Sequence, residues 1–181
     1  MLDKLKRAAR DLRTLVEEIR SLDIKEKDAN QALKNCTAHG SLDDPKTQRK
    51  VGDARIMLDL VSSRRANVKR LIDETIATIK AEYAAADEAW TTQVKARHLI
   101  LTNRLHAALL PFFEGNTNDM LNAIEPVHFP VLHEVSRAHT PDISPIERAT
   151  EPAQIIETVK TFVRHVQSQS KRLGLPNGEA S

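Results

Sequence analysis

The side chains with the clearest potential for chemistry lie in one short segment, VHFPVLHEVSRAH, residues 127–139. It holds Glu134 and three histidines, which are His128, His133 and His139. Such side chains bind zinc when they converge on one point, and on a helix that requires a spacing of three or four. These histidines are five and six residues apart, Pro130 interrupts the first interval, and no HExxH pattern is present. We therefore expect loop and short-helix histidines here, with no metal site and no cofactor.

A second group of potential ligands surrounds the single cysteine of the chain. Cys36 and His39 are three residues apart in CTAH, and Asp43 and Asp44 follow. This is half of a metal site at most. Cys36 also falls on an apolar helical series, which favours a thiol packed in a core. A lone cysteine excludes an intramolecular disulfide framework, so we expect a reducing compartment and a cytoplasmic protein.

Sequence motifs for catalysis are missing. The chain has no GxSxG elbow, no P-loop and no GxGxxG. Its paired acids, such as Glu17–Glu18 and Asp87–Glu88, fall on polar faces of predicted helices, where nothing shifts a pKa for acid–base work. We predict that the protein is not an enzyme. An enzyme with a site in a helical bundle is kept as a less favoured alternative.

The elements that position these residues are predicted to be helices. Aromatic residues make up 3% of the chain and glycines number five, a composition that favours helix over a sandwich or barrel. Apolar residues repeat every seven positions from the N-terminus, with a second series three residues behind, as in a coiled coil. This pattern predicts a first helix over about residues 3–38. The two series are Leu5, Leu12, Ile19, Glu26, Leu33 and Ala8, Leu15, Leu22, Ala29, Cys36.

A second, much longer helix is predicted from Pro45 to about residue 110, capped by Asp43 or Asp44. Between Pro45 and Leu110 there is no further proline, and Gly52 is the one glycine. The sevenfold series continues to about residue 76 and then changes phase, which indicates a change of packing partner. The two series before the change are Val51, Leu58, Arg65, Ile72, Ile79 and Ala54, Val61, Val68, Thr75.

Together these features predict an all-α fold in which a long antiparallel coiled-coil hairpin extends from a small three- or four-helix bundle. The hairpin arm covers residues 1–80, with helices at about 3–38 and 45–80. The bundle covers 81–173 and contains the long helix to about 110, short helices and a final helix at about 152–173. Residues 174–181 are expected to be a flexible tail. Trp90 is expected to be buried against the final helix. No stretch of the chain has the length and apolar character of a membrane span.

Charge suggests one candidate binding surface. The net charge is +2, but residues 44–72 carry eight Lys or Arg against three Asp. A candidate anion-binding patch lies in SSRRANVKR and consists of Arg64, Arg65, Lys69 and Arg70. It could bind nucleic acid or an anionic membrane. In the hairpin, however, residue n of the first helix faces about 82 − n of the second. Arg65 then faces Glu17, and Arg64 faces Glu18, so we favour internal charge pairing.

Apolar residues outside the sevenfold series suggest another surface. Four of them share one level of the hairpin and form a candidate self-association patch: Ile24, Ile56, Met57 and Leu60. Clustered exposed apolar residues need cover, and the same patch on a second copy can supply it, giving a homodimer. Cover by residues 127–150 of the same chain is the alternative. The favoured function is therefore a non-enzymatic helical interaction or scaffold protein with protein partners, itself a homo-oligomer.

Overall fold

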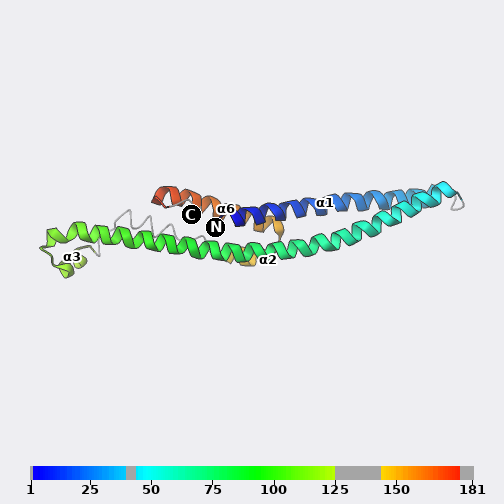
Figure 1. Cartoon of the computed structure of the whole chain (residues 1–181). Helices are drawn as coiled ribbons and strands as arrows, with labels where there is room; N and C mark the ends of the chain where they lie inside the picture. Colours follow the sequence, from blue (N-terminus) through cyan, green and yellow to red (C-terminus); the bar gives the residue numbers. More distant parts are fainter. Residues whose placement is uncertain (1, 40–43, 125–143, 176–181) are drawn as a thin grey trace. The chain divides into compact units, whose positions relative to one another are not determined.

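The computed structural model describes residues 2–39, 44–124 and 144–175, and every regular element within them is helical (Figure 1). No strand occurs in these ranges. The all-α class predicted from the sequence is confirmed. The elements, in chain order, are α1 Leu2–His39, α2 Pro45–Leu109, the 3-10 helix η1 Leu110–Phe113, α3 Thr117–Ile124, α5 Ser144–Arg148 and α6 Pro152–Leu173.

Local chemistry accounts for where α2 begins and ends. At its start, the Asp44 carboxylate accepts hydrogen bonds from the backbone N–H groups of Lys46 at 3.3 Å and Thr47 at 3.0 Å. The Thr47 hydroxyl donates a further bond at 2.9 Å, and together these bonds hold the pKa of Asp44 below its ordinary value. Past η1, Glu114 and Gly115 adopt φ values of 52° and 81°. This left-handed backbone ends η1, which directly follows α2.

The helices α3 and α6 also have identifiable ends. α3 is capped by Asn116, whose Oδ1 accepts the backbone N–H groups of Asn118 at 3.1 Å and Asp119 at 3.3 Å. α6 ends at Gly174, which has a φ of 60°, and the N–H of Leu175 returns to the carbonyl of Ser170 at 2.9 Å. Glycine tolerates this conformation because it has no Cβ.

The chain forms two compact units, and α2 contributes to both, with the division after Ile79. The helix-pair unit comprises Arg7–Ile79 and Thr150–Ile156. The other, the C-terminal unit, comprises Met1–Lys6, Lys80–Ala149 and Glu157–Ser181.

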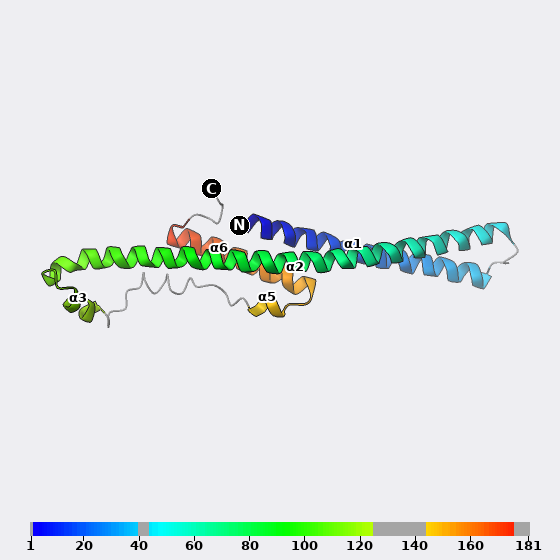
Figure 2. The ribbon, with the colours of Figure 1, turned by 60° about the horizontal axis from the view of Figure 1, so that its bottom comes forward.

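In the helix-pair unit, α1 packs against α2, and both views show the two helices side by side (Figures 1 and 2). They run antiparallel, because residues late in α1 lie beside residues early in α2, as Cys36 and Lys50 do. Most of the buried residues that α1 and α2 contribute to this unit belong to the sevenfold series, with Ala9 as an exception. A central cluster joins Leu22 of α1 to Val61 and Val68 of α2. Leu15, Ile19 and Ile72 pack around this cluster.

The core of the C-terminal unit is built on the second part of α2 and on α6. The Tyr83 and Phe162 rings meet with centroids 4.5 Å apart and planes inclined by 41°. The Nζ of Lys80 donates to the carbonyl of Glu147 at 3.2 Å. Trp90 is 0% exposed, so its predicted burial is confirmed. Other buried members of this unit include Leu2, Leu5, Ala86, Val94, Ile146, Val159, Val163 and Val166.

Candidate interaction surface

The four residues of the candidate self-association patch all lie exposed on the helix-pair unit. Their exposed fractions are 60% for Ile24, 60% for Ile56, 45% for Met57 and 61% for Leu60. They are exposed because none of them belongs to the sevenfold series, whose members face the partner helix. The pairing of this patch with a second copy stays a prediction.

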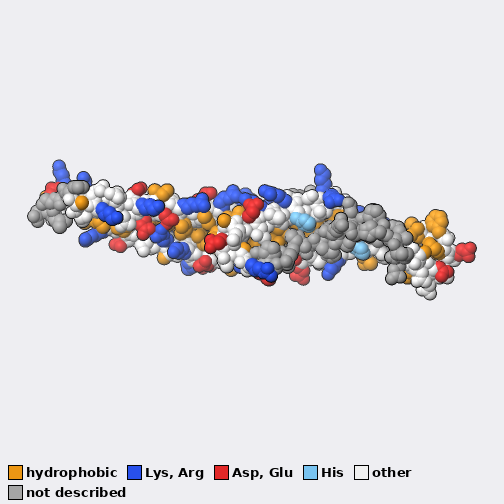
Figure 3. Space-filling view, turned by 180° about the vertical axis from the view of Figure 1, so that it is seen from behind, with side chains coloured by type: hydrophobic (Ala, Val, Ile, Leu, Met, Phe, Trp, Pro, Cys, Tyr) orange, Lys and Arg blue, Asp and Glu red, His pale blue; other side chains and the backbone are white. Residues whose placement is uncertain are grey.

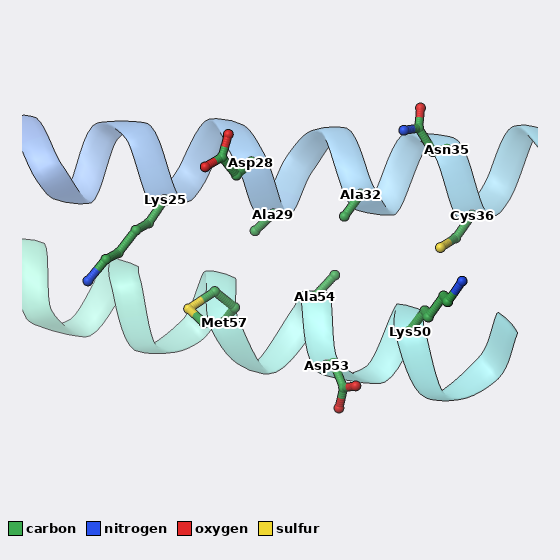
Figure 4. A pocket seen from close by; sticks show the side chains of 10 residues that line it. All are labelled: Lys25, Asp28, Ala29, Ala32, Asn35, Cys36, Lys50, Asp53, Ala54 and Met57. Atoms are coloured by element: carbon green, nitrogen blue, oxygen red, sulfur yellow. The ribbon is translucent and has the colours of Figure 1, made fainter. Parts of the chain in front are cut away.

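Beside the patch, α1 and α2 enclose an open groove of about 670 Å³ (Figure 4). Its lining includes Ala29, Ala32 and Cys36 of α1, which point toward the opposite helix, and Ala54 of α2, which points back toward them. Alanine side chains stop at Cβ, so paired alanines leave space between the backbones that larger side chains would fill. Met57 lines the groove and is also a member of the patch.

The patch and the groove belong to one face of the helix pair. Residues three or four apart share a face of a helix. Leu60 follows the groove residue Met57 by three positions, Ile56 follows the groove residue Asp53 by three, and Ile24 precedes the groove residue Asp28 by four. We call the groove together with these four side chains the apolar face.

The edge of the groove carries balanced charge. Lys25 and Asp28 come from α1, and Lys50 and Asp53 come from α2. Each helix therefore contributes one cation and one anion, three residues apart. The charges elsewhere on the helix pair are also mixed, since Figure 3 shows Lys and Arg interspersed with Asp and Glu on the side that it displays.

The candidate anion-binding patch is largely occupied by carboxylates of the chain itself. The Nε of Arg64 lies 2.6 Å from Oε1 of Glu18, which confirms the predicted pair. Hydrogen bonding to this carboxylate raises the pKa of Arg64. Arg70 pairs with Glu74 at 2.6 Å. Of the four patch residues, Lys69 alone has no ion pair with a described residue.

Arg65 departs from the sequence prediction. Its guanidinium contacts Asp23 and lies 2.6 Å from the carboxylate of Glu26, so the prediction of Glu17 as its partner is wrong. Each side chain of a helix leans toward that helix's N-terminus. In an antiparallel pair, Arg65 therefore leans toward later residues of α1, and Glu26 leans to meet it. Hydrogen bonding to Asp23 is the main cause that raises the pKa of Arg65.

The predicted loop and short-helix histidines cannot be compared with the structure, because their segment lies outside the described residues. The residues concerned are His128, His133, Glu134 and His139. Within the described ranges, no group of three or more His, Cys, Asp or Glu side chains is placed to hold a metal ion. Cys36 is half-buried and has a free thiol. A search of the described helices for a segment both long enough and apolar enough to cross a bilayer finds none.

The sequence analysis placed Asp87 on a polar helix face where nothing shifts a pKa, and for this residue the prediction is wrong. Asp87, in the C-terminal unit, is 5% exposed, and its Oδ1 has no hydrogen-bond partner among the described residues. Burial raises the pKa of this group, because a low-dielectric surrounding disfavours the charged form. The sequence signal was its position four residues after Tyr83 and three before Trp90, which places it beside both on the helix.

Comparison of the chain with protein-family models, with curated proteins and with solved structures finds no match in any of the three.

Proposed function

We propose that this protein is a non-enzymatic interaction or scaffold protein, and that it binds protein partners through the apolar face of the α1–α2 pair. In this proposal the pair is an antiparallel coiled-coil hairpin over residues 1–80, and residues 81–173 form a helical bundle. The observation that carries the proposal is the group of four large apolar side chains that are exposed beside an open, alanine-lined groove.

The four exposed side chains supply part of the free energy that binding requires. Burying a fully exposed Leu, Ile or Met side chain contributes about 1.5–3 kcal/mol. The four side chains are 45–61% exposed, so each contributes roughly half of that, and together they contribute about 3–6 kcal/mol. Association costs ~4–15 kcal/mol in lost freedom. A partner must therefore make further contacts, and the groove offers them, because it holds apolar surface that a partner's side chains can fill.

The alternative of nucleic acid or anionic membrane as the partner has less support. Phosphate groups would have to displace the carboxylates that already pair with Arg64, Arg65 and Arg70. Breaking an existing arginine–carboxylate pair costs free energy, and this cost offsets part of what a new arginine–phosphate contact contributes. The balanced charge at the edge of the groove also gives no excess attraction for an anion.

Photo-crosslinking in the cells that make the protein tests the proposal. The photoreactive residue p-benzoylphenylalanine replaces Leu60 in the full chain, and a control chain carries it at Ser62. Ser62 is also exposed but lies about 200° around the helix from Leu60. We expect adducts with protein at position 60 that are absent at position 62, identified by mass spectrometry. Adducts with only nucleic acid or lipid, or equal adducts at both positions, would contradict the proposal.

A further inference from the structure

We infer that the partner of the apolar face is a second copy of this chain. In this two-fold dimer, the large apolar side chains of each copy insert into the alanine-lined groove of the other. The inference rests on the proposed function, because it names the partner of the same surface. The candidates elsewhere in the described chain, such as the buried Asp87, lack a second group or a cavity that would make them a site.

Shape is the first argument. A two-fold interface brings the same surface of both copies together, so that surface must carry both the projecting and the receiving parts. The apolar face does so. Met57 and Leu60 project, with 45% and 61% exposure, and the groove floor beside them is made of Ala29, Ala32 and Ala54. In helix bundles, side chains of one helix commonly enter the spaces between side chains of a neighbouring helix, and the proposed dimer extends this packing to a groove between two helices.

Charge is the second argument. The groove edge carries Lys25 and Asp28 on one helix and Lys50 and Asp53 on the other. A two-fold axis can place a lysine of one copy opposite an aspartate of its partner, and each such contact occurs twice. An edge with two cations and two anions is therefore complementary to itself. A partner with a strong charge of either sign would gain from half of the edge and be repelled by the other half.

The single cysteine gives a direct measure of groove occupancy. Cys36 lines the groove and is half-buried with a free thiol. It is the one cysteine of the sequence, so any thiol reagent reports on this position alone. A second copy inserted into the groove covers the sulfur. The rate of maleimide labelling of Cys36 should therefore fall as protein concentration rises through the range in which the dimer forms.

Three variants of the full chain test the arrangement by sedimentation over a concentration series. Leu60→Lys puts a charge on a projecting residue and should weaken the dimer by at least about tenfold, because the charge must be desolvated. Ala32→Leu fills the groove and should weaken it too. Ala32 is exposed and leucine is a good helix former, so the helix itself persists. Leu99→Lys is the matched control, because Leu99 is 60% exposed and Leu60 is 61% exposed, but Leu99 belongs to the C-terminal unit.

We expect a dimeric wild type and a dimeric Leu99→Lys, with dissociation in the other two variants. Circular dichroism establishes that each variant keeps the helix content of the wild type. A monomeric wild type overturns the inference, as does a Leu60→Lys chain that dimerises like the wild type. Tighter association of Ala32→Leu overturns the insertion into the groove. A monomeric wild type that still forms adducts with other proteins at position 60 removes the second copy as partner and leaves the proposed function standing.

Discussion

Replacing Phe162 by alanine should destabilise the C-terminal unit by about 3–5 kcal/mol, the usual cost of this truncation in a packed core. Phe162 is 0% exposed, and its ring centroid lies 4.5 Å from that of Tyr83. A ring pair at such a distance contributes about 0.5–1.5 kcal/mol beyond the buried area, and this is part of the loss. Domains are stable by about 5–15 kcal/mol, so the variant loses a large fraction of the total.

Urea unfolding followed by the fluorescence of Trp90 measures this effect, because Trp90 is 0% exposed and belongs to the same unit as Phe162. Phe112→Ala is the matched control. It makes the same chemical change at a residue that is 81% exposed, and it should change the free energy of unfolding by no more than about 0.5 kcal/mol. If both variants unfold at the same urea concentration as the wild type, α6 does not pack on α2 through Phe162, and the account of this core is wrong.

Two further predictions concern charge. Arg65→Glu should lower the urea midpoint of the helix-pair unit, because the new carboxylate faces Asp23 and Glu26, and Asp23→Lys in the same chain should recover part of the loss. A double-mutant cycle without coupling would contradict the pairing. Because burial raises the pKa of Asp87, its ionisation destabilises the folded chain. The penalty is absent below the ordinary pKa of 3.8, grows as pH rises toward the raised value and is complete above it. The free energy of unfolding of Asp87→Asn, relative to that of the wild type, should therefore be higher at about pH 7 than at about pH 3.5. Urea unfolding of both proteins at the two pH values measures this change. If Asp87→Asn and the wild type differ in free energy of unfolding by the same amount at both pH values, Asp87 does not titrate in this way.

The sequence was sufficient to predict the helices and their ends, because both depend on neighbours along the chain. Asp44 specifies the start of α2 through hydrogen bonds to backbone N–H groups two and three residues further on. Pro45 suits the first turn of the helix because it has no N–H to leave unpaired. The sevenfold apolar series identified most of the buried residues of α1 and of α2 up to Ile79. The apolar residues of these segments that fall outside the series were predicted to be exposed. The exposure of Ile24 and Leu60 was predicted in this way.

Features that depend on the distance between helices could not be predicted. The groove exists because Ala29 and Ala54 are too small to fill the space between α1 and α2. The sevenfold pattern counts alanine and leucine equally as apolar, so it does not predict such a space. The partners of Arg65 depend on how far its long side chain leans, which a rule based on residue numbers ignores. The burial of Asp87 depends on elements that pack around α2, and a polar residue beside two aromatic ones is compatible with either burial or exposure.

The ion pair between Arg65 and Glu26 has a consequence for how the chain finds its native alignment. Both residues occupy positions of the sevenfold series where apolar residues otherwise stand. If α2 slid by one repeat along α1, apolar residues would still meet apolar residues at most levels, so the misaligned form would keep much of its packing. The two charges, however, would be displaced by ~10.5 Å, seven residues at ~1.5 Å each. In the native alignment, a guanidinium nitrogen of Arg65 lies 2.6 Å from a carboxylate oxygen of Glu26. Each would be left half-buried without its counterion, which makes misaligned forms short-lived during folding. An apolar residue at position 65 removes this discrimination, so such a variant could gain stability and yet populate more than one alignment.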